Sequence, residues 1–354
     1  MKYICPKCKR VSVDGNQWCQ EKHCPAENAL EVFDNGEWFS NIEIVERLTV
    51  LRSSTIYKAY RDEQSVLLKV AHDGCEERLK REARLLYQLS TRGRHPMFPN
   101  LLPAHEQAPL KDFPYSKVVL HGKTRYYEVF EHAEGEILRD MLFKNQQPYF
   151  MHVGWLVISL SDAILFMHRA KKLHLGLNPD IVLVRFDKEK IPRPILLDLG
   201  AADDAQNVLQ NWDHRFTFPS YTAPELINMN GKVGSATDVY GLGLILYELL
   251  AGLPAYKYDL QKDEDIFRSV LQGSFASTGR TDLINIPQIA EASINRNYDS
   301  RPKDVANFAL LLQKNFPPIP KEKKERKINW RTVLIVLGVL LAISMLLILA
   351  TLTV

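Results

Sequence analysis

Four of the five cysteines in this 354-residue chain lie within its first 24 residues. They form two short pairs about ten residues apart, and thiolates at such spacing suit tetrahedral coordination of zinc. A segment this small cannot bury a core without a metal or a disulfide, and disulfides would require an oxidising compartment. We therefore predict a zinc ribbon over residues 1–30, with His23 as an alternative to the last cysteine. The predicted ligands are Cys5, Cys8, Cys19 and Cys24.

Three charged side chains further along the chain lie in or beside patterned apolar segments. Lys69 ends the apolar run 66–68, which has the composition of a buried strand. Glu82 lies in the segment 76–89, whose apolar residues recur at helical spacing. Asp198 follows another apolar run and precedes Leu-Gly. Each feature is ordinary when taken singly, so only their order along the chain can indicate a family or a function.

In that order, these features resemble the motifs of protein kinases, and the resemblance extends from about residue 40 to about residue 316. In kinases the lysine grips the ATP phosphates, the glutamate pairs with that lysine and the aspartate binds magnesium. The resemblance implies an α+β fold of two lobes joined by a hinge at 131–133, with Phe130 at the gatekeeper position. Three further matches, which we interpret as architectural, are Glu225, Asp238 and Arg301.

The stretch 174–183 resembles the catalytic loop of kinases without its reacting groups. His174 is retained, but Gly176 stands at the place of the aspartate that accepts the substrate proton. Asn178 replaces the loop lysine, and Ile181 replaces the asparagine that holds the second magnesium ion. Glycine has no proton acceptor and isoleucine cannot ligate a hard cation. We therefore expect phosphoryl transfer to be absent or very weak.

The nucleotide pocket also departs from the kinase pattern. Leu67 lies two residues before Lys69 on the same face of a strand, where it would occupy volume that adenine needs. Lys69, Glu82 and Asp198 remain as candidate ligands of a nucleotide and one magnesium ion. We expect ATP to bind poorly. Kinases also have glycines, which let the backbone approach the phosphates, at the positions of Thr49, Leu51 and Ser54.

Residues 333–354 form a run of 22 residues without a charged side chain. As a helix, this run would cross a hydrocarbon core of ~30 Å at ~1.5 Å per residue, so we predict a transmembrane helix. The preceding residues 321–331 carry six bases against two acids. Such segments tend to stay on the cytoplasmic side and attract anionic lipid head groups. We expect a single-pass membrane protein whose N-terminal bulk lies in the cytoplasm.

These features divide the chain into five parts. They are a zinc ribbon at 1–30, a linker at 31–40, a kinase-like domain at 41–316 whose small lobe ends near residue 133, a Pro-rich and basic linker at 317–332, and the transmembrane helix at 333–354. The net charge of +3 comes from the basic linker, so we expect no binding of nucleic acid.

The sequence favours a membrane-anchored pseudokinase, a signalling or scaffolding module that acts through contacts with unidentified protein partners. Two alternatives stay open. One is a divergent Ser/Thr protein kinase with weak ATP-dependent activity, for which Asp180 is the nearest acid. The other is a non-catalytic nucleotide sensor, in which ATP shifts lobe closure without being consumed.

Overall fold

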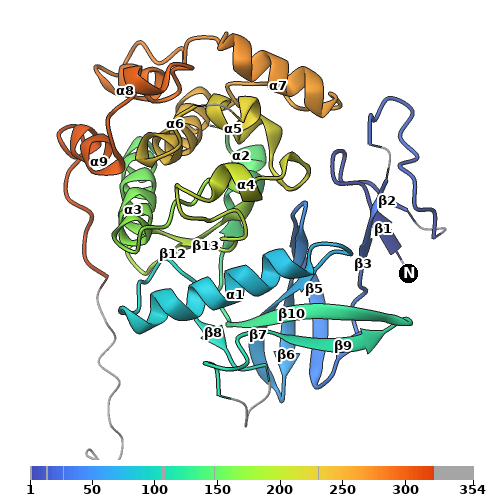
Figure 1. Cartoon of the computed structure of the whole chain (residues 1–354). Coiled ribbons are helices and arrows are strands. Elements are labelled where there is room, and N and C mark those ends of the chain that lie inside the picture. Colours follow the sequence, from blue (N-terminus) through green and yellow to red (C-terminus); the bar gives the residue numbers. More distant parts are fainter. Residues whose placement is uncertain are drawn as a thin grey trace, which may run out of the picture. The chain divides into compact units, whose positions relative to one another are not determined.

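The computed structural model of the protein describes residues 2–12, 15–26, 28–104, 109–146, 148–229 and 231–322. The predicted transmembrane helix at 333–354 and all but the first two residues of the basic segment 321–331 lie outside this part. The unit Met1–Pro318 contains a small N-terminal sheet, a lobe rich in strands and a lobe rich in helices (Figure 1).

The N-terminal segment folds into an antiparallel sheet in the order β2-β1-β3. Among the described residues of this segment, the apolar cluster is small: its buried members are Ile4 and Val32, which pack against Val50 of the next sheet. So few buried aliphatic side chains cannot hold ~30 residues in one conformation, which agrees with the expected need for a metal. The strands are β1 (Lys2–Ile4), β2 (Val11–Ser12) and β3 (Leu30–Val32).

Within the described residues, a seven-stranded sheet forms the small lobe in the order β4-β5-β6-β7-β10-β8, with β9 paired to β10. One face carries an aromatic core in which Phe39, Tyr57 and Tyr127 are fully buried. Because side chains alternate along a strand, the opposite face of β7 presents Leu67 and Lys69. The strands are β4 (Trp38–Phe39), β5 (Ile42–Val50), β6 (Ser54–Arg61), β7 (Gln64–Ala71), β8 (Leu101–Leu102), β9 (Ser116–Leu120) and β10 (Lys123–Glu131).

Helix α1 (Glu76–Thr91) packs against β10 of this sheet and carries Glu82. The predicted helix at 76–89 is confirmed and continues for two further residues. Glu82 is the charged member of an otherwise apolar buried face, so its carboxylate is directed into the protein. The buried positions are Leu79, Glu82, Ala83, Leu85, Leu86 and Leu89.

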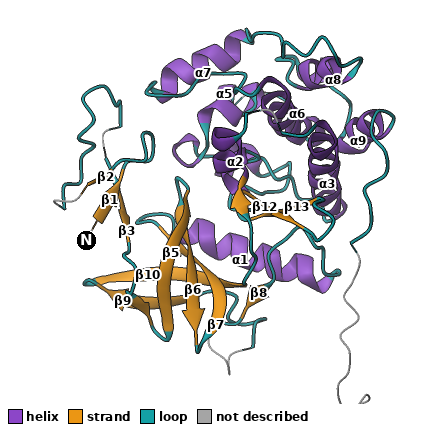
Figure 2. Cartoon of the chain, turned by 180° about the vertical axis from the view of Figure 1, so that it is seen from behind, coloured by secondary structure: helices purple, strands orange, loops and turns teal. Residues whose placement is uncertain are grey.

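The large lobe is mostly helical (Figure 2). Its central helix α6 (Ser235–Ala251) is buried at every position from 236 to 250, and a short sheet in the order β11-β12-β13 follows the hinge. The remaining elements are β11 (Glu136–Ile137), α2 (Leu138–Lys144), α3 (Phe150–Arg169), η1 (Pro179–Ile181), β12 (Val182–Phe186), β13 (Pro192–Leu196), α4 (Val208–Asn211), η2 (His214–Phe216), η3 (Pro219–Tyr221), α5 (Pro224–Asn228), α7 (Asp263–Gln272), α8 (Ile286–Ser293), η4 (Tyr298–Ser300) and α9 (Val305–Gln313).

Among the described residues, α3 is the one helix that is long and apolar enough to cross a membrane, with a mean hydropathy of 1.7. Of its most apolar stretch, 61% is buried inside the protein. Helices α6 and α9 pack against it. Because neighbouring helices cover α3, its apolar composition is explained by its place in the core of the large lobe.

Asp238 at the start of α6 holds the loop that carries His174. Its carboxylate accepts the backbone N–H groups of His174 at 2.9 Å and Leu175 at 2.7 Å. Leu175 has φ of +63°, a left-handed conformation that leucine rarely adopts, and these charge-assisted bonds stabilise it. Arg301 forms a buried bidentate pair with Glu225 at 2.8 and 2.9 Å. The architectural interpretation of these matches is confirmed.

Candidate functional site

Three of the predicted site residues meet in the cleft between the lobes. Lys69 Nζ lies 2.7 and 2.6 Å from the carboxylate oxygens of Glu82 and 2.5 Å from Oδ1 of Asp198. It also donates to the carbonyl of Leu197 at 3.2 Å. The exposed fractions of the three charged residues are 1%, 2% and 8%. A phosphate or magnesium ion would have to replace some of these direct ion pairs in order to bind.

Burial and Lys69 have opposing effects on the two acids. Burial raises the pKa of Glu82 to about 7, although Lys69 works against the shift. Burial also tends to raise the pKa of Asp198, but Lys69 and Arg78 outweigh it and bring the value to about 2. The charge of Lys69 is therefore balanced mainly by Asp198.

Glu128 on β10 adds a fourth buried ionisable group to this cluster. The carboxylate of Glu128 lies 3.9 Å from Lys69 Nζ, and Glu128 is 0% exposed. Neither oxygen of this carboxylate has a hydrogen-bond partner among the described residues. Burial raises the pKa of Glu128 well above its ordinary value, and the charge of Glu82 raises it further. In the folded protein, the neutral form of Glu128 is therefore favoured over the charged form.

Glu128→Gln should therefore stabilise the protein more at pH 8 than at pH 5. The folded-state pKa of Glu128 is raised, so its contribution to stability is present at low pH and is lost as the pH rises through the raised value. Glutamine has the same size and cannot ionise. The stabilising effect of Glu128→Gln should therefore grow between the two pH values, in the direction set by the raised pKa of Glu128. Urea unfolding of both proteins at both pH values measures it, and an equal effect at each pH would contradict the assignment.

The position that corresponds to a catalytic base is closed. A Cβ added to Gly176 would lie 2.9 Å from Cβ of Ala201, closer than real Cβ atoms approach. Ile181 is 2% exposed and offers no oxygen. The side chain of Asn178 caps η1, because its Oδ1 accepts the backbone N–H of Asp180 at 2.9 Å and its Nδ2 donates to the carbonyl of Gly176 at 2.9 Å. These residues shape the loop and supply no base.

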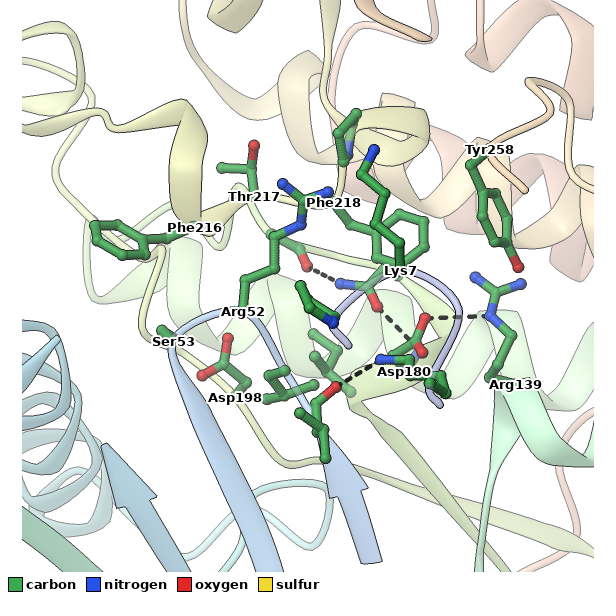
Figure 3. Close-up of a pocket in the computed structure, with 18 of the residues that line it drawn as sticks. Lys7, Arg52, Ser53, Arg139, Asp180, Asp198, Phe216, Thr217, Phe218 and Tyr258 are labelled. Atoms are coloured by element: carbon green, nitrogen blue, oxygen red, sulfur yellow. Dashed lines mark hydrogen bonds and ion pairs between the residues drawn. The ribbon is translucent and has the colours of Figure 1, made fainter. Parts of the chain in front are cut away.

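Asp180, the acid nearest to the base position, is held in a buried ion-pair network (Figure 3). Arg139 of α2 donates from Nε to Asp180 at 3.1 Å and from Nη1 to Glu248 of α6 at 2.5 Å. All three residues are at most 7% exposed. The geometry favours a structural role for Asp180. The guanidinium of Arg139 also lies 5.2 to 5.6 Å from the ring centroids of Phe218, Tyr221 and Tyr258.

The family model described as protein kinase domain matches residues 47–308, more than half of the chain. The chain belongs to this family. Its relatives include death-associated protein kinase 2 of Mus musculus, 23% identical over 189 residues that make up 53% of this chain and 45% of the relative. Serine/threonine-protein kinase DCLK3 of Homo sapiens is 25% identical over 180 residues, 50% of this chain and 25% of the relative. CBL-interacting protein kinase 24 of Oryza sativa subsp. japonica is 31% identical over 173 residues, 47% of this chain and 37% of the relative. The chain spans less than half the length of these relatives.

A kinase domain implies ATP and magnesium, and the cleft of this kinase domain fits them in part. A cavity of about 460 Å³ reaches Asp198 and the loop 50–53, so the phosphate end of the cleft is open. At the adenine end, Leu67 of β7 and Phe130 of β10 are neighbours in register and are both 0% exposed. Of the residues that the structure describes, those lining the cavity do not include Leu67 or the hinge 131–133. The cleft therefore fits phosphate groups and one magnesium ion better than it fits adenine.

The four cysteines converge on one point in the N-terminal segment. The Sγ atoms of Cys5 and Cys24 lie 3.5 Å apart, and those of Cys8 and Cys19 lie 3.4 Å apart. All four lie within 4.8 Å of one another and are free thiols. Tetrahedral zinc with bonds of ~2.3 Å places its sulfur ligands ~3.8 Å apart, close to this arrangement. The cluster could hold a metal ion, and Cys24 rather than His23 completes it.

Glu128 and Arg139 belong to the cleft, yet no kinase motif in the sequence points to them. Glu128 carries a signal that could have revealed it, because it lies two residues before Phe130 on a strand of period two and must share its buried face. The sequence around Arg139 contains no such signal. Its acidic partners Asp180 and Glu248 are 41 and 109 residues away in sequence, and no local pattern predicts such contacts.

Proposed function

We propose that the protein is a membrane-anchored pseudokinase that acts on the cytoplasmic side through contacts with other proteins, with phosphoryl transfer lost. The observation that supports this most directly is Gly176, where an added Cβ would lie 2.9 Å from that of Ala201, so that any side chain there requires the loop or Ala201 to shift. Loss of a general base alone often costs ~10²-fold or more in rate. The second metal ligand is replaced by Ile181, a hydrocarbon that cannot bind magnesium.

The kinase residue types that the chain retains favour a domain that stays folded in order to bind other proteins. Their contacts, such as the pair between Glu225 and Arg301 within the large lobe, are buried and stabilise the kinase-like fold. In this proposal the ribbon at 1–30 holds one zinc ion through its four cysteines, and the linker 31–40 leads to the kinase domain at 41–316. The Pro-rich and basic linker 317–332 then leads to the membrane helix at 333–354.

A nucleotide sensor is the second candidate, and the open phosphate end of the cleft favours it. Asp198 lines the cavity of about 460 Å³ and pairs with the buried Lys69, and both keep the residue types that kinases use for phosphate and magnesium. Binding would have to loosen the direct pair between these two residues. A ligand that does so would shift the population of cleft conformations without being consumed.

Leu67→Ala should raise the affinity for ATP and lower the stability at the same time. The smaller side chain frees volume at the adenine end, whereas trimming a buried leucine commonly costs ~2 to 5 kcal/mol. Calorimetric titration of magnesium-ATP and urea unfolding measure the two effects on residues 1–320. Tight magnesium-dependent binding by the wild type that Leu67→Ala does not improve would favour the sensor. Phosphate transfer to protein substrates, abolished by Lys69→Met, would reject the pseudokinase.

Leu68→Ala is the matched control. Leu68 is the neighbouring residue on β7, is also 0% exposed, and lies in the aromatic core on the opposite face of the sheet. It should lower the stability by a similar amount and leave the affinity for ATP unchanged. A gain in affinity for both variants would mean that loosening the small lobe, and not freed adenine volume, is responsible.

Membrane attachment should depend on residues 333–354. The full chain is expected in the membrane fraction after alkaline extraction, because this run has the length and apolarity of a spanning helix. Residues 1–320 are expected in the soluble fraction, since the apolar helix α3 is covered by the large lobe. Firm membrane association of residues 1–320 would show that the anchor lies elsewhere.

A further inference from the structure

The first knuckle of the ribbon, which we define as residues 6–9, lies at the mouth of the kinase cleft (Figure 3). All four of its residues line the cavity of about 460 Å³. The loop 50–53 of the small lobe and the residues 258–260 of the large lobe line the same cavity. The ribbon therefore contributes a wall to the cleft and is more than an appendage of the kinase domain.

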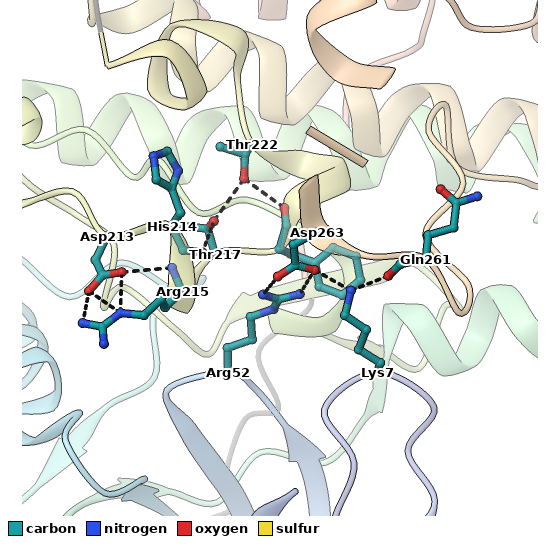
Figure 4. A network of polar contacts seen from close by, with 10 residues as sticks. Lys7, Arg52, Asp213, His214, Arg215, Thr217, Thr222, Gln261 and Asp263 are labelled. Carbon is teal, nitrogen blue, oxygen red and sulfur yellow. Dashed lines mark hydrogen bonds and ion pairs between the residues drawn. The ribbon is translucent and has the colours of Figure 1, made fainter. Parts of the chain in front are cut away.

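Asp263, the first residue of α7, joins three parts of the chain (Figure 4). Its carboxylate accepts from Lys7 Nζ at 2.5 Å, and it accepts from the two terminal nitrogens of Arg52 at 2.5 and 3.0 Å. Lys7 Nζ also donates to the backbone carbonyl of Gln261 at 2.5 Å. The side chains of Lys7, Arg52 and Asp263 are only 13%, 19% and 26% exposed, so water screens them less than surface pairs. The start of a helix also favours a negative charge.

The ribbon is tied to the small lobe as well. Lys9 Nζ donates to the carbonyl of Val50 at 2.9 Å, and the buried Ile4 and Val32 pack against the side chain of Val50. Val50 ends β5 and leads into the loop that carries Arg52. The ribbon, this loop and the start of α7 are therefore linked to one another, and the cleft cannot open at this point without breaking their contacts.

The conformation of the knuckle depends on the cysteine cluster. Lys7 lies between two of its members, and the backbone N–H groups of Lys7 and Cys8 point at Sγ of Cys5 at 3.4 and 3.5 Å. The part of the ribbon that the structure describes has few buried apolar side chains of its own. A metal held by the four thiolates would therefore fix the direction of Lys7, and its loss would release the knuckle.

We propose that the ribbon is a metal-dependent lid whose first knuckle occupies, in the same chain, a docking surface for basic peptides on the large lobe. This docking surface consists of residues 258–263, with Asp263 as its acceptor. A protein partner that uses the cleft must replace Lys7 on Asp263, so it carries a lysine or arginine in an exposed segment. The inference rests on the proposed function only for the role of the partner. The lid itself can be tested without it.

Hydrogen exchange measured by mass spectrometry on the full chain in detergent tests the lid. Asp263→Asn and Lys7→Ala should each raise the exchange of the segments 51–54 and 261–266 by roughly tenfold, because local opening sets the exchange rate of protected amides. Removal of metal by a chelator should have the same effect, and adding zinc back should reverse it. Elemental analysis of the untreated protein should find one zinc per chain.

Arg10→Ala is the control, because Arg10 pairs with Glu21 inside the ribbon at 3.1 Å and both side chains are well exposed. It should leave the exchange of both segments unchanged. If Asp263→Asn raises the exchange and Lys7→Ala does not, the contact belongs to Arg52 alone and the lid is rejected. Unchanged exchange after metal removal would reject the dependence on metal.

A peptide that spans residues 6–10 with Ala in place of Cys8, acetyl-Pro-Lys-Ala-Lys-Arg amide, tests the docking surface by fluorescence anisotropy. The tethered knuckle competes at an effective concentration on the order of millimolar, so Lys7→Ala should bind the peptide roughly tenfold more tightly than the wild type. Asp263→Asn should bind it at least tenfold more weakly than Lys7→Ala, because the negative charge of the acceptor is lost. Equal binding by all three proteins would reject the docking surface, whether or not the protein proves to be a pseudokinase.

Discussion

Replacing Lys69 by methionine is expected to lower the free energy of unfolding by about 3 to 5 kcal/mol, the usual cost of removing one partner from a buried ion pair. Lys69 is 1% exposed and bonds Glu82 and Asp198 directly. Methionine would leave these carboxylates, with Glu128 beside them, in a dry site without the direct counter-charge of Lys69. The acids can avoid this cost only by taking up protons. The loss should therefore be larger at pH 8 than at pH 5.

Urea unfolding of residues 1–320 measures this effect, and Lys232→Met is a suitable control. Lys232 pairs with Asp299 at 3.3 Å, but the two side chains are 71% and 76% exposed, so its loss should change the stability by less than about 1 kcal/mol. Adding Asp198→Asn to Lys69→Met should recover much of the loss, since it removes one of the stranded charges. If Lys69→Met proves as harmless as Lys232→Met, the buried cluster does not hold the lobes together.

A large loss of stability in Lys69→Met would also change how the retention of Lys69 is interpreted. In an active kinase this lysine serves the phosphates of ATP. Here it donates to two acids and one carbonyl, and the pair with Asp198 leaves that carboxylate partly occupied. Retention of the kinase residue types is then explained by the stability of the fold, and it says little about activity.

Short-range patterns in the sequence predicted most of what positions this cluster. The apolar spacing of α1 places Glu82 on its buried face, and the alternation along β7 places Lys69 opposite the aromatic core. The kinase resemblance then brings these elements to Asp198. Each step depends on periodicity or on the order of motifs, both of which are visible in one sequence.

Contacts between distant segments were not predictable in this way. Lys7 and Arg52 meet Asp263 across 256 and 211 residues, and nothing in the ribbon motif indicates that its knuckle faces a cleft. The loop sequence shows that Gly176 lacks a proton acceptor, but it does not show that Ala201 fills the space beside it. The choice between His23 and Cys24 also depends on how the chain turns in three dimensions, which the spacing leaves open.

Restoring the kinase residue types by Gly176→Asp and Ile181→Asn should not restore phosphate transfer. The new Cβ at residue 176 would meet Cβ of Ala201 at 2.9 Å, so the loop must shift and the carboxylate cannot take its catalytic position. Gly176→Asp alone should lower the free energy of unfolding by about 1 to 3 kcal/mol, the usual cost of overpacking. Single-turnover assays with magnesium-ATP and a mixture of protein substrates, together with urea unfolding, measure the two effects.

Ala201→Gly provides the matched test, because it removes the atom that closes the position. Combined with Gly176→Asp, it should recover at least half of the lost stability, whereas the two changes would simply add if they acted independently. Any gain of phosphate transfer should then appear in the triple variant with Ile181→Asn and not in the double variant that keeps Ala201. Robust transfer by the variant with Ala201 in place would mean that the cleft accommodates a catalytic base as it stands. The loss of activity would then follow from the missing side chains alone and could be reversed by two substitutions.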